Sequence, residues 1–261
     1  MNLSLERKNA LICGSSQGIG FAIAQELALL GANCILLARN TGALEHAVQK
    51  LSTDFNQEHS YAVADFSKQE EVQVAIAQIV KQKPVHILVN NTGGPAAGPI
   101  MDAQEEDFLN AFQQHLICNH ILTKAVVPGM KEEGYGRIIN VISTSVKTPL
   151  QNLGVSNTIR AAVASWAKTM ANELGMFNIT VNNVLPGLTK TARLESLVQN
   201  TAQKRQVSTV AVEEAMKNEI PLKRFGQPSE IAAMAAFLAS PAASFVSGTS
   251  IPVDGGRTGS I

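Results

Sequence analysis

The residues most clearly suited to chemistry form a glycine-rich turn near the N-terminus, Cys13-Gly14-Ser15-Ser16-Gln17-Gly18-Ile19-Gly20. A short apolar run precedes this turn, and a stretch of apolar and alanine residues, 21–30, follows it. The order predicts a strand, a tight turn and a buried helix, whose free N–H groups and positive dipole end suit a phosphate. Gly14 would form the turn, Gly18 would admit a pyrophosphate, and Gly20 would let the helix pack on the strand. A ligand-free turn would use the same glycines, so that alternative stays open.

The next two predicted strands end in residues that could select the dinucleotide. In dinucleotide folds an acidic residue at the end of the second strand binds the ribose hydroxyls, whereas arginine suits a 2′-phosphate. Here Ala38 replaces the acid and Arg39 supplies a cation, which favours NADP(H) over NAD(H) unless Arg39 is only a solvated loop residue. Asp65 follows the third strand and could either accept a hydrogen bond from an adenine amino group or cap the next helix.

Strand-like and helix-like segments alternate along the whole sequence without a linker or a repeat. This pattern predicts one α/β domain, residues 1–261, with a doubly wound parallel sheet. Strands are expected at 10–13, 34–37, 61–64, 85–89, 137–142, 180–185 and 250–253, and helices at 21–30, 41–55, 68–82, 105–130, 155–174 and 229–239, the last with Ser229 as N-cap. The polar segment 188–222 is predicted to be a mobile lid with helical pieces. Small residues in 155–174 suit close packing in an oligomer.

Composition excludes several classes of partner. The chain has 21 Lys and Arg residues and 21 Asp and Glu residues, so it lacks a basic field for nucleic acid, and a small-molecule substrate is expected. No apolar stretch reaches membrane-spanning length and no secretory leader is evident, which predicts a cytoplasmic protein. Cys13, Cys34 and Cys118 fall inside predicted elements without metal-ligand spacing, so we expect buried thiols and no metal site.

From end to end, the chain resembles the short-chain dehydrogenase/reductases. The resemblance rests on these motifs: Gly14-x-x-x-Gly18-x-Gly20, Asp65, Asn90-Asn91-Thr92-Gly93, Gly136-Arg137-Ile138-Ile139-Asn140, Asn182-x-x-x-Pro186-Gly187, Arg224-Phe225-Gly226-Gln227-Pro228 and Val253-Asp254-Gly255-Gly256. It is most similar to 3-oxoacyl-carrier-protein reductases. The resemblance implies a Rossmann-type, three-layer α/β/α fold with about seven parallel strands. It also implies NAD(P)(H), carbonyl or alcohol substrates, and a homotetramer or dimer built on the two long helices.

The resemblance also assigns cofactor-binding residues. It places Gly14, Ser16, Gly18 and Ile19 at the pyrophosphate, Arg39 at the 2′-phosphate, Asp65 and Phe66 at the adenine, Asn90 at its ribose, and Pro186, Gly187 and Thr191 at the nicotinamide. Gln17 stands where NADP-dependent members often have Arg or Lys, which speaks against NADP.

The catalytic positions depart from the family. Members use an Asn, a Ser and a Tyr-x-x-x-Lys pair; the Ser is present as Ser143, but the other positions hold His115, Ser156 and Arg160. The only tyrosines, at 61 and 135, are not placed to reach the nicotinamide. Ser156 and Arg160 are four residues apart and so share a helix face, but an alkyl hydroxyl is a weak acid and a guanidinium keeps its proton.

Three functions are compatible with this site. One is an NADPH-dependent carbonyl reductase in which Ser143 and Ser156 bind the oxygen, Arg160 stabilises negative charge, and His115 or water supplies the proton. A second is a weakly active or inactive NADP-binding scaffold, and a third is a reductase of a conjugated C=C bond. His115 has the one ordinary pKa suited to acid–base work, although a lone helix histidine is more often structural. Lys147, Lys190 and Arg193 would either attract an anionic compound or remain solvated.

Overall fold

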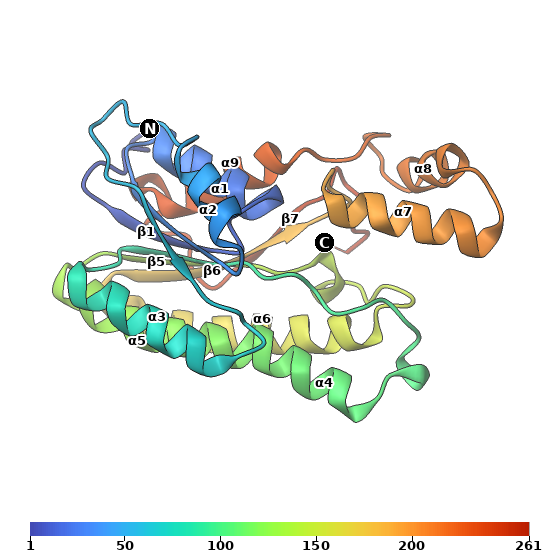
Figure 1. Ribbon diagram of the computed structural model, residues 1–261, viewed down its shortest axis with the longest axis horizontal. Coiled ribbons are helices and arrows are strands. Elements are labelled where there is room, and N and C mark those ends of the chain that lie inside the picture. Colours follow the sequence, from blue (N-terminus) through green and yellow to red (C-terminus); the bar gives the residue numbers. More distant parts are fainter. Residues whose placement is uncertain (261) are drawn as a thin grey trace.

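The computed structural model describes residues 1–260, in which seven parallel strands form one sheet between two layers of helices (Figure 1). The strand order is β3-β2-β1-β4-β5-β6-β7. The strands are β1 (Asn9–Cys13), β2 (Asn33–Ala38), β3 (Ser60–Val63), β4 (Ile87–Asn90), β5 (Gly136–Val141), β6 (Ile179–Pro186) and β7 (Ser250–Val253). The predicted Rossmann-type, three-layer sheet is therefore confirmed.

The strands follow the apolar runs of the sequence because helices cover both faces of the sheet. Every residue of β1, β4 and β5 is buried. Parallel strands covered on both faces appear in a sequence as continuous apolar runs rather than as alternation. The edge strand β3 alternates instead between half-buried and exposed residues. The buried central strands therefore hold the turns that follow their carboxyl ends along one edge of the sheet.

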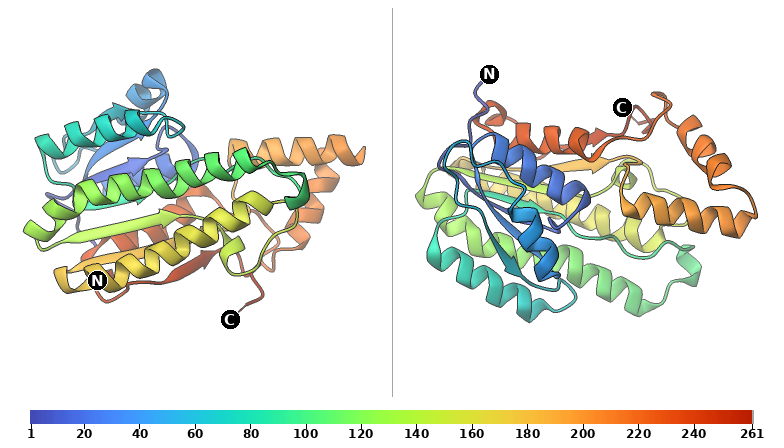
Figure 2. Two further views of the ribbon diagram at one scale, coloured as in Figure 1. Left: turned by 90° about the horizontal axis from the view of Figure 1, so that it is seen from below. Right: turned by 45° about the horizontal axis from the view of Figure 1, so that its top comes forward.

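Two groups of helices enclose the sheet (Figures 1 and 2). One face carries α1 (Gly18–Leu29), α2 (Thr41–Val48) and α9 (Pro228–Ala239). The other carries α3 (Gln69–Gln82), α5 (Cys118–Glu132) and α6 (Gly154–Leu174). Each group has its own apolar core with the sheet. No helix within residues 1–260 is long and apolar enough to cross a membrane.

Three predicted helices differ from the observed ones. The helix expected at 41–55 ends at Val48. The helix expected at 105–130 consists of α4 (Glu105–Phe112), a π-helical turn (Gln113–Ile117) and α5. Ser229 as the N-cap of the last helix was wrong: α9 begins at Pro228, and Gln227 caps it. The side chain of Gln227 forms a capping box with Glu230. Pro228, at the first helical position, has no N–H group that would need a partner there.

The lid, residues 188–222, contains two regular helices, α7 (Ala192–Arg205) and α8 (Thr209–Asn218). They project beyond the carboxyl ends of the strands, on the side where α4 also extends (Figure 1). Their own small apolar cluster consists of Leu194, Val198, Ala202, Val212, Ile220 and Phe225. Helical pieces were predicted here, and the mobility of the lid stays a prediction.

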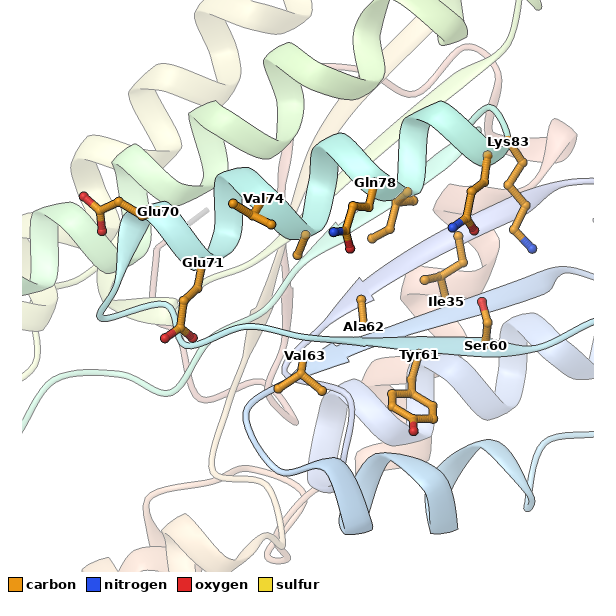
Figure 3. Close-up of a pocket in the computed structure, with 13 residues that line it drawn as sticks. Ile35, Ser60, Tyr61, Ala62, Val63, Glu70, Glu71, Val74, Gln78 and Lys83 are labelled. Carbon is orange, nitrogen blue, oxygen red and sulfur yellow. The ribbon is translucent and has the colours of Figure 1, made fainter.

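A cavity of about 480 Å³ lies between β3 and α3, at the edge of the sheet (Figure 3). Its lining includes Tyr61 and Val74 but no residue predicted to act in catalysis or cofactor binding.

Both tyrosines of the chain are bonded away from Ser143. The hydroxyl of Tyr61 donates to Glu45 at 2.8 Å. Tyr135 donates to the carbonyl of Ala239 at 2.6 Å and precedes β5, whereas Ser143 follows that strand. Eight residues of near-extended chain separate Tyr135 from Ser143 by roughly 26 Å.

Candidate active site

The glycine-rich turn after β1 is fixed by hydrogen bonds to two strands. Gly14 N–H donates to the carbonyl of Leu37 at 2.8 Å. The buried Ser15 hydroxyl donates to Ile12 at 2.7 Å and accepts from Leu37 N–H at 3.1 Å. Gly14 and Gly18 both have positive φ, 58° and 60°, which favours glycine there. The turn is therefore rigid before any ligand binds.

The start of α1 leaves backbone donors open to a ligand. The N-cap of α1, Gln17, makes no capping hydrogen bond through its side chain, and the first turn has no acidic residue. Ser16 and Ile19 are half-buried in the same turn. Unpaired N–H groups at the positive end of a helix dipole bind anions such as phosphate. The turn thus fits the pyrophosphate of a dinucleotide.

Gly20 permits the close approach that the sequence predicted, and Asn91 completes it. A Cβ on Gly20 would overlap the carbonyl oxygen of Gly14 and lie 2.7 Å from Nδ2 of Asn91. Asn91 Nδ2 donates to the carbonyls of Cys13 and Gly14, each at 3.2 Å. Asn91 therefore ties the turn after β4 to the glycine-rich turn. Sequence reasoning gave it no such role, because an asparagine in a polar turn does not reveal its partner.

At the ends of β2 and β3, Arg39 and Asp65 lie side by side. Nη1 of Arg39 is 3.9 Å from Oδ2 of Asp65, and the arginine side chain is 75% exposed. Partial burial would raise the pKa of Asp65, but hydrogen bonds from Ser67 and the charges of Arg39 and Lys68 outweigh it and lower that pKa. Asp65 is not the helix cap that was the alternative, because Lys68 occupies that position. The exposed guanidinium is free to meet a 2′-phosphate.

The residue after Asp65, Phe66, is buried against the helix layer. Its carbonyl oxygen accepts a hydrogen bond from Cys118 Sγ at 3.4 Å. Burial raises the pKa of the Cys118 thiol to about 11, and Cys13 and Cys34 are buried as well. All three cysteines are therefore unreactive thiols in the apolar core, as expected from the sequence.

A row of amides crosses the sheet just below its carboxyl rim, and we call it the amide ladder. Asn90 Nδ2 donates to Asn140 Oδ1 at 2.9 Å, and Asn140 Nδ2 donates to Asn183 Oδ1 at 2.9 Å. Asn183 Nδ2 then donates to Ser250 Oγ at 3.0 Å. Within residues 1–260 the buried Oδ1 of Asn90 has no hydrogen-bond partner. Contact of Asn90 with a ribose stays a prediction. The amide nitrogen of Asn90 is already bonded inside the sheet, so its side chain has only Oδ1 left for such a contact.

Ser143 and Ser156 present hydroxyl groups from two different elements. Ser143 follows β5, is half-buried, and accepts a hydrogen bond from Ser145 N–H at 3.1 Å. Ser156 lies in the first turn of α6 and is 6% exposed. Within residues 1–260 the hydroxyl of Ser156 forms no hydrogen bond, and that of Ser143 donates none. Both hydroxyl protons can therefore be donated to a substrate oxygen.

Arg160 is a buried cation one turn further along α6. Its Nη1 donates to the carbonyl of Val141 at 3.2 Å, and its Nη2 donates to that of Thr92 at 3.3 Å. The residue is 7% exposed and pairs with no carboxylate in residues 1–260. Burial, together with the charge of Arg193, lowers the pKa of Arg160 to about 10, so it stays positive at neutral pH. It links the end of β5 to the turn after β4.

His115 lies in the π-helical turn between α4 and α5, a type of irregularity that is frequent at functional sites. Its side chain is buried, and Nδ1 is 2.5 Å from the hydroxyl oxygen of Thr92. Burial, then the charges of Arg160 and Arg193, lower the pKa of His115 to about 3. The imidazole is therefore neutral at physiological pH. Thr92, which sequence reasoning missed, connects His115 through its hydroxyl to Arg160 through its carbonyl.

The segment after β6 brings a second helix start toward the glycine-rich turn. Gly187 N–H donates to Val253 at 3.0 Å, and a Cβ on Gly187 would lie 2.7 Å from Cα of Asp254. Thr191 caps α7 by accepting from Leu194 N–H at 3.4 Å. A Cβ on Gly18 would lie 3.6 Å from Cγ2 of Thr191. The starts of α1 and α7 therefore face each other, on either side of the site proposed for the dinucleotide.

Of the three cations that were predicted near the mouth, one reaches into the site. Lys147, Lys190 and Arg193 are all exposed. Arg193, in the first turn of α7, nevertheless donates from Nη2 to the carbonyl of Pro95 at 3.2 Å, in the turn after β4. Its positive charge contributes to the lowered pKa values of His115 and Arg160.

Known proteins of one family are similar to this chain in both sequence and structure. A family model described as enoyl-(acyl carrier protein) reductase matches residues 14–258. The NADPH-dependent reductase BacG of Bacillus subtilis (strain 168) is 31% identical over 259 residues, covering 98% of this chain and 100% of BacG. The 3-oxoacyl-acyl-carrier-protein reductase FabG of Pseudomonas aeruginosa is 34% identical over 258 residues, covering 97% of this chain and 98% of FabG.

A solved structure extends the likeness to the whole fold. The L-sorbose reductase of Gluconobacter frateurii, complexed with NADPH and L-sorbose, has a TM-score of 0.94 and 30% identity, and the match covers 100% of each chain. Because the family model covers residues 14–258 and these relatives match nearly the whole chain, the chain belongs to the short-chain dehydrogenase/reductase family.

Proposed function

We propose that the protein is an NADP(H)-dependent oxidoreductase that reduces the carbonyl group of a small molecule, a 3-oxoacyl compound or a related ketone. Family membership and the NADPH-dependent relatives support the cofactor and the reaction class. The observation that carries the proposal is the position of Arg160, a buried cation fixed between Val141 and Thr92 on the same helix face as Ser156. With the substrate bound beside Ser156, this positive charge would lie close to the carbonyl oxygen that becomes negative.

The residues present fit NADP(H). The glycine-rich turn and the uncapped start of α1 would bind the pyrophosphate, and Arg39 would bind the 2′-phosphate. The adenine would lie at Asp65 and Phe66, with Asn90 near its ribose. Pro186, Gly187 and Thr191 would border the nicotinamide. When bound, the reduced cofactor supplies the hydride.

Ser143, Ser156 and Arg160 would bind the substrate oxygen. The two free hydroxyl protons can donate to a carbonyl oxygen, and the guanidinium stabilises the charge that develops there. Because the site is largely buried, this stabilisation is stronger than it would be in water. Arg160 itself stays protonated, so its part is electrostatic.

Water is the proton donor that best fits the site. His115 is neutral, with a pKa of about 3, and the serine hydroxyls are as weakly acidic as water. Water is supplied in excess by the solvent, so an oxyanion stabilised by Arg160 would take its proton from water. We assign His115 a positioning role, in which the neutral imidazole keeps Thr92 and the nearby solvent in place. General acid catalysis contributes about 10²- to 10⁴-fold to a rate, and proximity can contribute more, so the loss of the phenol need not abolish hydride transfer.

The absence of a strong acid also favours a second candidate, reduction of a conjugated C=C bond. In that reaction negative charge forms on the carbonyl oxygen of an enolate, which Ser143, Ser156 and Arg160 would stabilise in the same way. Carbon then takes its proton from water, and no phenol is required. The neutral state of His115 is the specific observation that favours it.

Turnover and binding assays separate these functions from a non-catalytic scaffold. NADPH oxidation would be followed with ketones, 3-oxoacyl thioesters and enones, alongside thermal shift with NADPH and NADH. We expect stabilisation by NADPH and turnover of at least one ketone or thioester. Turnover of enones alone would establish the second candidate. NADPH binding without turnover of any compound would refute both reductase proposals.

Cellular and quaternary assignments stay predictions from the sequence. Neither the cytoplasmic location nor the homotetramer that the family resemblance implies is tested by the comparisons. α5 and α6, the two long helices of that prediction, lie next to each other on one face of the sheet (Figure 2).

A further inference from the structure

Arg193 has no part in the function proposed above, yet it lies in the candidate active site. Arg193 is an exposed residue, but its guanidinium lies against Gly94 and donates to the carbonyl of Pro95 at 3.2 Å. A Cβ on Gly94 would collide with both terminal nitrogens of Arg193. The glycine therefore creates the space in which this guanidinium lies.

Two arginines bind the same turn from different helices. Arg160, from α6, donates to the carbonyl of Thr92, and Arg193, from α7, donates to that of Pro95, three residues further on. The turn between them also carries the hydroxyl that bonds His115. Two positive charges are thus bonded to one turn of the chain, and the third ionisable group bonded to that turn, His115, is neutral.

No acidic side chain balances these charges. Within residues 1–260 neither Arg160 nor Arg193 forms an ion pair, although Arg224 and Arg257 do. A buried cation without a counter-ion is costly, and two adjacent cations repel each other. Such a site gains most when an anion enters, because a guanidinium binds a carboxylate through two parallel, charge-assisted hydrogen bonds.

We propose that the substrate is an anion and that Arg193 binds its carboxylate, while Ser143, Ser156 and Arg160 bind its reacting oxygen. This inference rests on the proposed function and narrows it from ketones in general to oxo acids or unsaturated acids. Arg193 is then a specificity-determining residue. The side chains of Lys147 and Lys190 do not bond to the turn that holds the two arginines, so they are not part of this carboxylate-binding group.

Phosphate of the cofactor is the other anion that these arginines could meet. The two sources differ in what Arg193 would affect. If Arg193 binds the substrate carboxylate, its removal weakens carboxylate binding and leaves the affinity for NADP⁺ unchanged. If Arg193 binds a cofactor phosphate, its removal instead lowers the affinity for NADP⁺.

The test measures binding to the protein–NADP⁺ complex by calorimetry, so it does not depend on turnover. The probes are 4-methyl-2-oxopentanoate, phenylacetate and acetate, each compared with its methyl ester. We expect at least one carboxylate to bind the wild-type complex about tenfold more tightly than its ester, the effect of one charge-assisted hydrogen bond. Arg193→Gln should abolish this preference, and NADP⁺ affinity should stay within about twofold.

Two further variants control the result. Arg205→Gln removes the same charge from the exposed far end of α7 and should keep the preference. Gly94→Ala keeps the arginine but displaces its guanidinium, and it should weaken the preference. A wild-type complex that prefers no carboxylate, a preference that survives Arg193→Gln, or a loss confined to NADP⁺ affinity would each overturn the inference. Failure of the proposed function would appear separately, as NADPH binding without turnover.

Discussion

Nη2 of Arg160 donates a hydrogen bond to the carbonyl oxygen of Thr92, so the active-site helix α6 is joined to the turn after β4. The same threonine bonds His115 through its hydroxyl. Three residues from three elements, Thr92, His115 and Arg160, therefore form one connected polar group. The family resemblance predicts that Arg160 stands at the position of the family's lysine, where a guanidinium would keep the positive charge but would not release a proton.

Restoring the phenol and the ammonium should restore the proton relay. The double variant Ser156→Tyr with Arg160→Lys is expected to raise kcat on simple ketones by about tenfold or more, within the range of general acid catalysis. Steady-state NADPH oxidation would measure this, with Ser156→Thr as a control that adds no acid. A double variant that binds NADPH normally but shows no gain would mean that the pocket is shaped for another reaction.

His115 should be replaceable by a neutral hydrogen-bonding side chain but not by alanine. We expect His115→Asn to keep kcat within about threefold and His115→Ala to lower it by about tenfold or more, because the latter leaves the Thr92 hydroxyl without its partner. Since the pKa of His115 is about 3, wild-type kcat should show no step from this residue between pH 6 and 8. An alanine variant with unchanged kcat would remove His115 from the mechanism.

Acid should destabilise the protein partly through His115. Its pKa is about 3 in the folded state and about 6.5 when unfolded, so its neutral form favours folding above pH 6.5. As the pH falls below 6.5 the unfolded chain takes up a proton that the folded chain does not. The free energy of unfolding should therefore lose about 2 kcal/mol by pH 5 from this residue.

Urea unfolding at pH 8 and pH 5 would measure this loss, with His115→Asn as the comparison. Burial and the charge of Lys8 also lower the pKa of His86, but that contribution is common to both proteins and cancels. An equal decrease in the wild type and the variant would contradict the assignment.

Arg39 should distinguish the two dinucleotides. Arg39→Gln is expected to raise the KM for NADPH by about tenfold or more, the loss of one charge-assisted hydrogen bond to the 2′-phosphate. The KM for NADH should change little, because the exposed ion pair with Asp65 contributes little by itself. Lys50→Gln, which removes an exposed charge after α2, is the control. Equal effects on the two cofactors would exclude Arg39 from phosphate binding.

The sequence was sufficient for the sheet and the phosphate turn, because continuous apolar runs and glycine spacing are local features. It was not sufficient where an outcome depends on distant contacts. The π-helical turn at His115 interrupts no apolar pattern, so one long helix was predicted there. The roles of Asn91 and Thr92 depend on partners many positions away. Similarly, the neutral state of His115 arises from burial and from arginines on two other helices.

The amide ladder also determines how the strands can be aligned. Asn90, Asn140, Asn183 and Ser250 are direct neighbours in the pairing of four consecutive strands. A slip of any one strand by a single residue would turn its polar side chain to the opposite face and leave buried amide groups without partners. Apolar strands alone tolerate such slips more readily. The ladder therefore selects one alignment of β4 through β7, and with it the relative heights of Thr92, Ser143 and Gly187.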